Sequence, residues 1–233
     1  MVGLRWMSDR GSRAVRSSSY GGAVIPATGG ITASHNHTTA FRRRGDGTTT
    51  RHALVIGGTG MLSACTSALV AEGWHVVLPS RRYAPIPTTP GNSGTGRALW
   101  VAADWSDPTG LAKRAKRALG GPVELLVAWV HREHRAAVLH EVAPLLAPGA
   151  PIVEVHGSAA AVLLDGYPEP VLPDHPTQQV VLGFVPVGRT SRRLSHEEIS
   201  AGVMAAVERA LAGKPPAVHQ VDEPRPWSTS GRS

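Results

Sequence analysis

The sequence predicts an α/β domain built on a doubly wound parallel sheet, and three observations support this prediction. From Arg51 onward, short apolar runs alternate with stretches of helical periodicity, which is typical of a sheet with helices on both faces. The run from Val123 to Val130 is almost entirely apolar, as expected for a strand buried on both faces. A glycine-rich turn directly follows the first apolar run. With 233 residues, we expect a single core.

The expected elements follow in order along the chain. We expect strands at 52–56, 74–78, 98–103, 123–130, 151–155 and 179–185, with an edge strand at 217–221. We expect helices from the glycine turn to about residue 72, from residue 108 onward, at 132–146 and at 196–211. Asp107 followed by Pro108 marks one helix start, and Ser195 with Glu198 forms a capping box that opens the last helix. Gly73 and Gly213 are suited to end helices in the left-handed conformation.

Three regions are predicted: a disordered basic tail at 1–50, a nucleotide-binding domain at 51–222 and a polar tail at 223–233. The first region holds seven arginines against Asp9 and Asp46, so it carries most of the net charge of +7. The rest is nearly neutral, which argues against a specific nucleic-acid surface. A DNA or RNA accessory role through the arginine tail stays as a minor alternative. The Arg- and Ser-rich tail also resembles an organellar transit peptide.

The sequence contains no apolar run of about 18 residues and no secretory signal, so we expect a cytoplasmic protein without a membrane span. Its single cysteine, Cys65, is interpreted as a small helix residue that packs on the sheet.

The turn Gly57-Gly58-Thr59-Gly60 follows the first strand, with Met61 and Leu62 leading into the helix. Glycines let the backbone approach a pyrophosphate, which the free N–H groups and positive end of the helix stabilise. The glycine spacing alone is a weak signal, but its place after the first strand strengthens it. A purely structural strand-to-helix turn is the alternative.

The end of the second strand favours NADP(H) over NAD(H). Ser80, Arg81 and Arg82 lie there, and arginine accommodates a 2′-phosphate where an acidic residue would pair with the ribose hydroxyl. Exposed arginines with no ligand are the alternative. Asp104 and Trp105 follow the third strand, where Asp104 would accept a hydrogen bond from adenine or instead belong to a helix cap.

Several segments resemble the short-chain dehydrogenase/reductase superfamily, over about residues 52 to 221. They are the turn with its flanking residues 53–62, the Asp104-x-Ser106 step, the fourth strand and Gly157-Ser158-Ala159. Residues 129–131, 179–184 and 194–200 are similar to a small bacterial, atypical subgroup. The resemblance implies a Rossmann fold with strand order 3-2-1-4-5-6, and dimers or tetramers. It also implies that Gly57, Gly58 and Gly60 hold pyrophosphate, that Arg81 and Arg82 lie at the 2′-phosphate, and that Asp104 contacts adenine.

The superfamily reduces carbonyls with a Tyr-x-x-x-Lys pair and a serine, and this chain lacks the pair: none of Lys113, Lys116 and Lys214 has a tyrosine four positions earlier. Ser158 matches the serine position, although a lone hydroxyl also caps turns. Replacement proton donors are His131 after the fourth strand, then His156 beside Gly157. Tyr167 is a further candidate.

We therefore expect an NADP(H)-dependent oxidoreductase of atypical short-chain type that acts on a small carbonyl or imine. The alternative is a noncatalytic NADP(H)-binding sensor or regulatory protein. The sequence shows no metal-site spacing and no nucleophile elbow.

Overall fold

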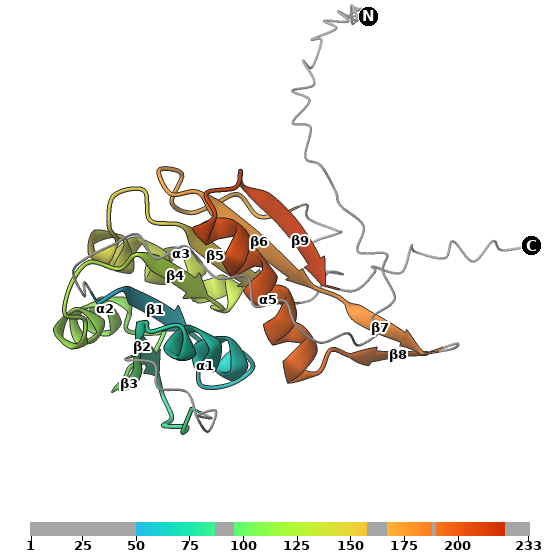
Figure 1. Cartoon of the computed structure of the whole chain (residues 1–233), viewed down its shortest axis with the longest axis horizontal. Helices are drawn as coiled ribbons and strands as arrows, with labels where there is room; N and C mark the ends of the chain where they lie inside the picture. The colour runs from blue at the N-terminus through green and yellow to red at the C-terminus, as the bar shows by residue number, and fades with distance from the viewer. Residues whose placement is uncertain (1–49, 87–95, 158–166, 188–189, 222–233) are drawn as a thin grey trace, which may run out of the picture.

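The computed structural model describes residues 50–86, 96–157, 167–187 and 190–221, in which strands and helices alternate as expected (Figure 1). The strands are β1 His52–Ile56, β2 His75–Ser80, β3 Arg97–Ala102, β4 Leu125–Ala128, β5 Ile152–His156, β6 Thr177–Leu182, β7 Phe184–Val187, β8 Thr190–Arg193 and β9 Ala217–Val221. The helices are α1 Ser63–Ala71, α2 Pro108–Ala118, α3 Arg132–Val142 with a 3₁₀ turn at Ala143–Leu145, and α5 His196–Leu211.

Seven strands form one parallel sheet in the order β3-β2-β1-β4-β5-β6-β9. This confirms the predicted doubly wound sheet, the order 3-2-1-4-5-6 and the edge strand at 217–221. The chain winds outward from the centre in both directions, so the strand order reverses between β1 and β4. In sheets of this kind, ligands bind beyond the carboxyl ends of the strands at that reversal.

Two separate cores cover the two faces of the sheet. Val55 of β1 belongs to the core under α1 and α5, whereas its neighbour Leu54 belongs to the core under α2 and α3. Figure 1 shows α5 and α1 on one side of the sheet and α2 and α3 on the other. Because successive side chains point to opposite faces, a central strand such as β1 is covered on both sides. All five of its residues are buried, and four of them, after His52, are apolar.

The structure confirms the helix ends that were predicted from capping residues and from glycines. The Asp107 side chain accepts a hydrogen bond from the Gly110 N–H at 2.9 Å, and Pro108 stands at the first helical position. Ser195 forms the capping box of α5. Gly73 and Gly213 follow helix ends with φ of 91° and 63°, a conformation that glycine adopts without a steric penalty.

β2 runs two residues further than predicted, through a buried proline, Pro79. Proline has no N–H for a strand ladder, which made Leu78 the expected end. The ladder with β1 ends at Val77, and beyond it β2 pairs only with β3. Pro79 therefore lies where β2 is an edge on one side, and an edge tolerates proline.

The predicted strand at 179–185 is wrong in its second half. β6 ends at Leu182, and Phe184–Val187 instead pairs with Thr190–Arg193 as an antiparallel hairpin, β7–β8, that projects from the body in Figure 1. The apolar run crosses Gly183 without a break, so hydrophobicity alone did not reveal the change of partner.

Two further elements are shorter than predicted. The strand expected at 123–130 is β4, Leu125–Ala128, and the helix expected at 132–146 ends at Val142, where the 3₁₀ turn begins. Pro144 lies in that turn, and proline cannot continue an α-helix.

The predicted tails fall outside the described residues, apart from Thr50. No helix within the described residues is long and apolar enough to cross a membrane.

Candidate functional site

The first two glycines of the turn between β1 and α1 are required by the fold itself. Gly57 has φ of +88°, and a Cβ there would lie 3.0 Å from the carbonyl oxygen of Trp129. A Cβ on Gly58 would lie 2.6 Å from a methyl group of Leu78 and 2.8 Å from one of Val55. Real Cβ atoms essentially never lie under 3.0 Å from such neighbours, which disfavours a larger residue at Gly58, and the positive φ of Gly57 strains any other residue there.

Gly60 differs from its neighbours, because a Cβ there would meet nothing within 4 Å. No described atom of the protein requires glycine at this exposed position. The missing side chain leaves the space above the turn open, which suits the close approach of a pyrophosphate.

The turn also offers hydrogen-bond donors. Within the described residues, the amides of Thr59, Met61 and Leu62 donate no hydrogen bond to a backbone carbonyl. They lie just before α1, whose N-terminus carries a partial positive charge. The Leu62 side chain is fully buried, so Leu62 would contribute only its backbone.

Two buried hydroxyl groups hold the turn in place. The Thr66 hydroxyl lies 3.1 Å from the carbonyl oxygen of Leu62 and 3.3 Å from that of Gly58. Ser200 of α5 donates its hydroxyl to the carbonyl oxygen of Met61 at 3.1 Å. Sequence reasoning missed Ser200, because no motif connects a serine in the last helix to a turn after the first strand.

The structure brings together Arg81 and Asp104, which follow two neighbouring strands. Arg81 Nε lies 3.9 Å from Asp104 Oδ2, and both side chains are exposed. The backbone N–H and hydroxyl of Ser106 both donate to Asp104 Oδ1 at 2.9 Å. These bonds, with a smaller effect of Arg81, lower the pKa of Asp104. Asp107 caps α2, so of the two predicted roles for Asp104 the helix cap is excluded.

Ser80 fixes the backbone that carries the two arginines. Its hydroxyl donates to the carbonyl oxygen of Arg82 at 2.7 Å and accepts from the indole N–H of Trp100 at 2.9 Å. Tyr83 packs edge-on against Trp100, with 5.7 Å between ring centroids. The Arg82 side chain is exposed. Ser80 is therefore a positioning residue in this structure.

His131 and Trp105 come together from the ends of β4 and β3. Their rings are 4.9 Å apart in an edge-on arrangement. His131 Nδ1 also lies 3.7 Å from a carboxylate oxygen of Glu133, and both side chains are well exposed. The structure thus joins His131 to the side of the site that carries Asp104 and Trp105.

His156 is the last residue of β5 and is mostly buried. Burial, together with the positive charge of Arg135, lowers its pKa to about 4. Its Nε2 atom is buried and has no hydrogen-bond partner among the described residues. The ring is therefore neutral at pH 7.

A buried polar cluster that sequence reasoning missed lies beside His156. Arg135 of α3 donates from Nε to Glu154 of β5 and from Nη2 to the carbonyl oxygen of Glu169 at 2.9 Å. Gln179 of β6, paired in register with Glu154, donates to the carbonyl oxygen of Pro168 at 2.7 Å. The cluster ties residues 168–169 to the sheet. Its sequence signal was Glu154, one charged residue within a buried apolar strand.

Of the two remaining predicted proton donors or carbonyl-binding groups, Ser158 and Tyr167, the structure describes only Tyr167. Ser158 lies outside the described residues, and Tyr167 is 48% exposed.

Cys65 is fully buried, and burial raises its pKa to about 12. This confirms its interpretation as a core residue and excludes an activated thiol at neutral pH. No three His, Cys, Asp or Glu residues within the described ranges are grouped to hold a metal ion.

Comparison with solved structures finds the same fold in several enzymes. A short-chain dehydrogenase/reductase from Serratia marcescens matches with a TM-score of 0.52 and 17% identity, over 74% of this chain and 96% of that one. The chain has the Rossmann fold of the short-chain dehydrogenases/reductases. An NADH-dependent reductase, A1-R′, in complex with NAD matches this Rossmann fold with a TM-score of 0.53 and 15% identity, over 74% and 95%.

A 3-oxoacyl-[acyl-carrier protein] reductase from Brucella melitensis also shares the Rossmann fold, with a TM-score of 0.51 and 13% identity over 76% of this chain and 97% of that one. No protein-family description matches the sequence, and no curated protein does. Within this Rossmann fold, the glycine turn lies at the carboxyl edge of β1, beside the strand-order reversal.

Proposed function

We propose that the chain is an NADP(H)-dependent oxidoreductase of atypical short-chain type that acts on a small carbonyl or imine. The observation that carries the proposal is the open glycine turn, with unpaired amides, at the strand-order reversal. The names of the neighbours support the oxidoreductase part of the proposal, since one is an NADH-dependent reductase bound to NAD and another a 3-oxoacyl reductase. The preference for NADP(H) rests on Arg81 and Arg82 alone.

The described residues fit a dinucleotide. The amides at Thr59, Met61 and Leu62 would hold the pyrophosphate above Gly60. Arg81 and Arg82 would donate hydrogen bonds to the 2′-phosphate of NADP(H). The ion pair of Arg81 with Asp104 does not oppose this role, because an exposed pair at 3.9 Å contributes little. The adenine would lie near Asp104 and Trp105.

When bound, the nicotinamide would supply a hydride or accept one. The protein must then orient the substrate oxygen or nitrogen and provide a proton. His156 is suited to orienting the substrate, because a neutral imidazole N–H can donate a hydrogen bond to a carbonyl oxygen and stabilise developing negative charge. With a pKa of about 4, its imidazolium is scarce at neutral pH. We therefore assign the proton to His131, with Ser158 as the hydroxyl that polarises the carbonyl.

A noncatalytic NADP(H)-binding sensor is the second candidate function. The absence of a Tyr-x-x-x-Lys pair favours it. Both candidates share the cofactor site and differ only in turnover.

Turnover is tested by following NADPH consumption with a panel of small aldehydes, ketones and imines. We expect His156→Gln and Ser158→Ala to lower kcat, each by at least about tenfold, as for loss of an acid–base or hydrogen-bonding group. His140→Gln, on the exposed face of α3, is the matched control. Unchanged turnover in both variants would remove this assignment. NADPH binding without turnover of any panel member would favour the sensor.

Cofactor selectivity is tested separately by titration with NADPH and NADH. Arg81→Ala and Arg82→Ala should each weaken NADPH binding by about tenfold, the effect of losing one charged hydrogen bond. Binding of NADH should change little. Arg117→Ala, an exposed position on α2, serves as the control. Equal losses for both cofactors would contradict the 2′-phosphate assignment.

A further inference from the structure

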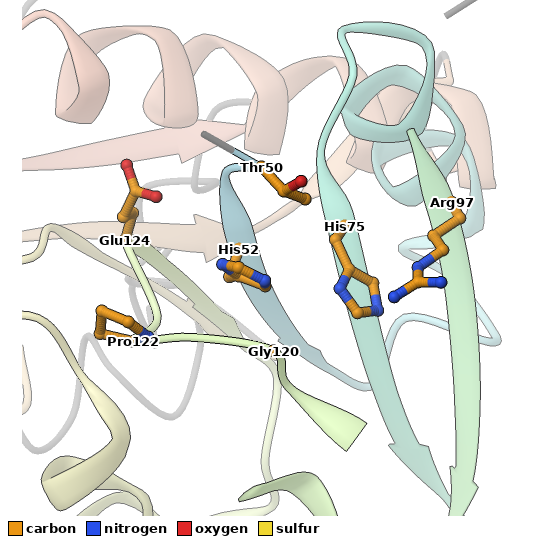
Figure 2. Close-up of a pocket in the computed structure, with 7 residues that line it drawn as sticks. All are labelled: Thr50, His52, His75, Arg97, Gly120, Pro122 and Glu124. Carbon is orange, nitrogen blue, oxygen red and sulfur yellow. The ribbon is translucent and has the colours of Figure 1, made fainter. Parts of the chain in front are cut away.

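A pocket lies at the edge of the sheet opposite the glycine turn, where the strands begin. Its volume is about 540 Å³, and it is lined by Thr50, His52, His75, Arg97, Gly120, Pro122 and Glu124. Figure 2 shows the side chains of His52, His75 and Arg97 next to one another on β1, β2 and β3. None of these residues belongs to the proposed cofactor site.

The three basic side chains form a row because of the strand register. His52 pairs with His75, and His75 pairs with Arg97, in parallel ladders. Paired residues on neighbouring strands point to the same face of a sheet. The two imidazole rings are 5.3 Å apart. Arg97 is exposed, and Figure 2 shows its guanidinium group beside His75.

The imidazole ring of His75 is buried without any hydrogen-bond partner among the described residues. His75 is 1% exposed, and both of its ring nitrogens are buried without a hydrogen bond to any described residue. An imidazole carries at least one N–H donor, and buried donors in folded proteins are nearly always paired. This unpaired ring beside an open pocket points to a ligand with acceptor atoms.

The charges around the row favour an anion. After burial, the positive charge of Arg97 is the next cause that lowers the pKa of His75, so Arg97 acts directly on this ring. Glu124 is the acidic residue of the lining, and its carboxylate points away from both imidazoles in Figure 2. A metal cation would be repelled by Arg97, and no metal-ligating group of three exists in the described part of the chain.

The turn at Gly120–Gly121 makes room for His52. A Cβ on Gly120 would lie 3.2 Å from Nε2 of that ring, and one on Gly121 would lie 3.0 Å from Cε1. The His52 ring is therefore fixed against the end of α2, and His52 is only 8% exposed. A rigid ring with an ordered neighbour loses little freedom when an anion binds.

We propose that His52, His75 and Arg97 form a binding site for a tetrahedral oxyanion, such as a free phosphate ion or the phosphate group of a small organic molecule. The imidazole N–H groups and the guanidinium group would donate to its oxygens. The pocket exceeds the size of a single anion and falls within the range of small-molecule sites. The site goes beyond the proposed function, since it lies at the opposite edge of the sheet.

The test follows the histidine ring signals of the full chain, labelled with ¹⁵N-histidine, by NMR during titration with sodium sulfate at constant ionic strength. The signals of His52 and His75 should shift and saturate together, while that of exposed His140 should not. Arg97→Gln should weaken sulfate binding about tenfold, and Arg97→Lys should keep part of the affinity. Lys113→Gln, outside the pocket, should have no effect.

Shifts that do not saturate, or equal affinity in the wild type and Arg97→Gln, would overturn the proposal. Arg97 is exposed at the start of an edge strand, so its substitution should leave the fold intact. Titrations with inorganic phosphate and phenyl phosphate separate the two sources of the anion. Tighter binding of phenyl phosphate would identify an organic phosphate, and equal binding would identify the free ion.

Discussion

At the scale of single residues, the glycine turn depends on a hydroxyl group from the last helix. Ser200 is 4% exposed and donates to the carbonyl oxygen of Met61. This bond fixes the backbone between Gly60 and α1, where the unpaired amides lie. A residue that touches no ligand thereby orients the groups that would bind one.

Ser200→Ala should lower the free energy of unfolding by about 1 kcal/mol, because the carbonyl oxygen of Met61 loses its hydrogen-bond partner. NADPH affinity should fall as well, since the turn is less fixed. Urea denaturation and NADPH titration measure the two effects. Ser191→Ala, at an exposed position of β8, should change neither, and an unchanged Ser200→Ala variant would show that the bond does not support the turn.

The sequence predicted the glycines but not the groups that hold them. Gly57, Gly58 and Gly60 stand next to one another after an apolar run, so local spacing reveals them. Ser200 contacts Met61 across 139 residues, and Arg135 reaches Glu154 from another element. Such contacts depend on helix packing, which periodicity does not encode.

His156 should make stability depend on pH. Its pKa falls from 6.5 to about 4 on folding, so the folded state disfavours its protonation. Stability is therefore complete above pH 6.5 and is lost as the pH falls toward 4, by at most about 3 kcal/mol. The pKa values of His75 and His219 are also lowered by burial, so they add to the same slope.

Urea denaturation between pH 7 and 4 measures this dependence. His156→Gln should reduce the slope but not abolish it, since the other two histidines remain. A slope equal to that of the wild type would show that His156 is not neutral and buried in the folded protein.

At the scale of elements, α5 begins with a doubly supported cap. Ser195 accepts from the Glu198 N–H at 3.1 Å, and Glu198 accepts from the Ser195 N–H at 2.7 Å. Arg192 of β8 donates to both oxygens of Glu198. These bonds, chiefly those from Arg192, lower the pKa of Glu198 to about 2. The cap therefore connects the β7–β8 hairpin to the helix that holds the glycine turn.

Glu198→Ala removes the acceptor for the Ser195 N–H and should lower the free energy of unfolding by about 1 kcal/mol, the typical effect of a lost cap. The pair with Arg192 is partly exposed and adds little. Because the folded pKa is depressed, the contribution of Glu198 is present above pH 4.5 and is lost as the pH falls toward 2. Glu197→Ala, in the same turn without a capping bond, is the control, and equal losses in both variants would exclude the cap.

The elements also show where sequence patterns stop being informative. The capping box predicted the start of α5 because Ser195 and Glu198 act within one turn. The β7–β8 hairpin was not predicted, because Val185 continues the apolar run of β6 while its backbone pairs with Arg192. Strand partners depend on the whole chain, whereas caps depend on four residues.

At the scale of the whole molecule, the sheet places two different sites at its two edges. The glycine turn, Arg81, Asp104 and His156 lie at or just beyond the carboxyl ends of the strands. The proposed oxyanion site lies at the opposite edge, where β1, β2 and β3 begin. The sheet order, predicted from the alternation and the resemblance, determines this separation. The basic row was not predicted, because it requires the register of three strands.

The central claim is that the turn at Gly60 binds NADP(H), and Gly60→Trp tests it most directly. A Cβ at Gly60 meets no described atom within 4 Å, so the variant should fold normally while its indole fills the space above the turn. Ala136→Trp, on the exposed face of α3, is the control. In a fluorescence titration with NADPH, the wild type and Ala136→Trp should bind with micromolar affinity or tighter, about 8 kcal/mol or more, and Gly60→Trp should not bind. Equal binding by all three proteins, or no binding by the wild type, would contradict the claim.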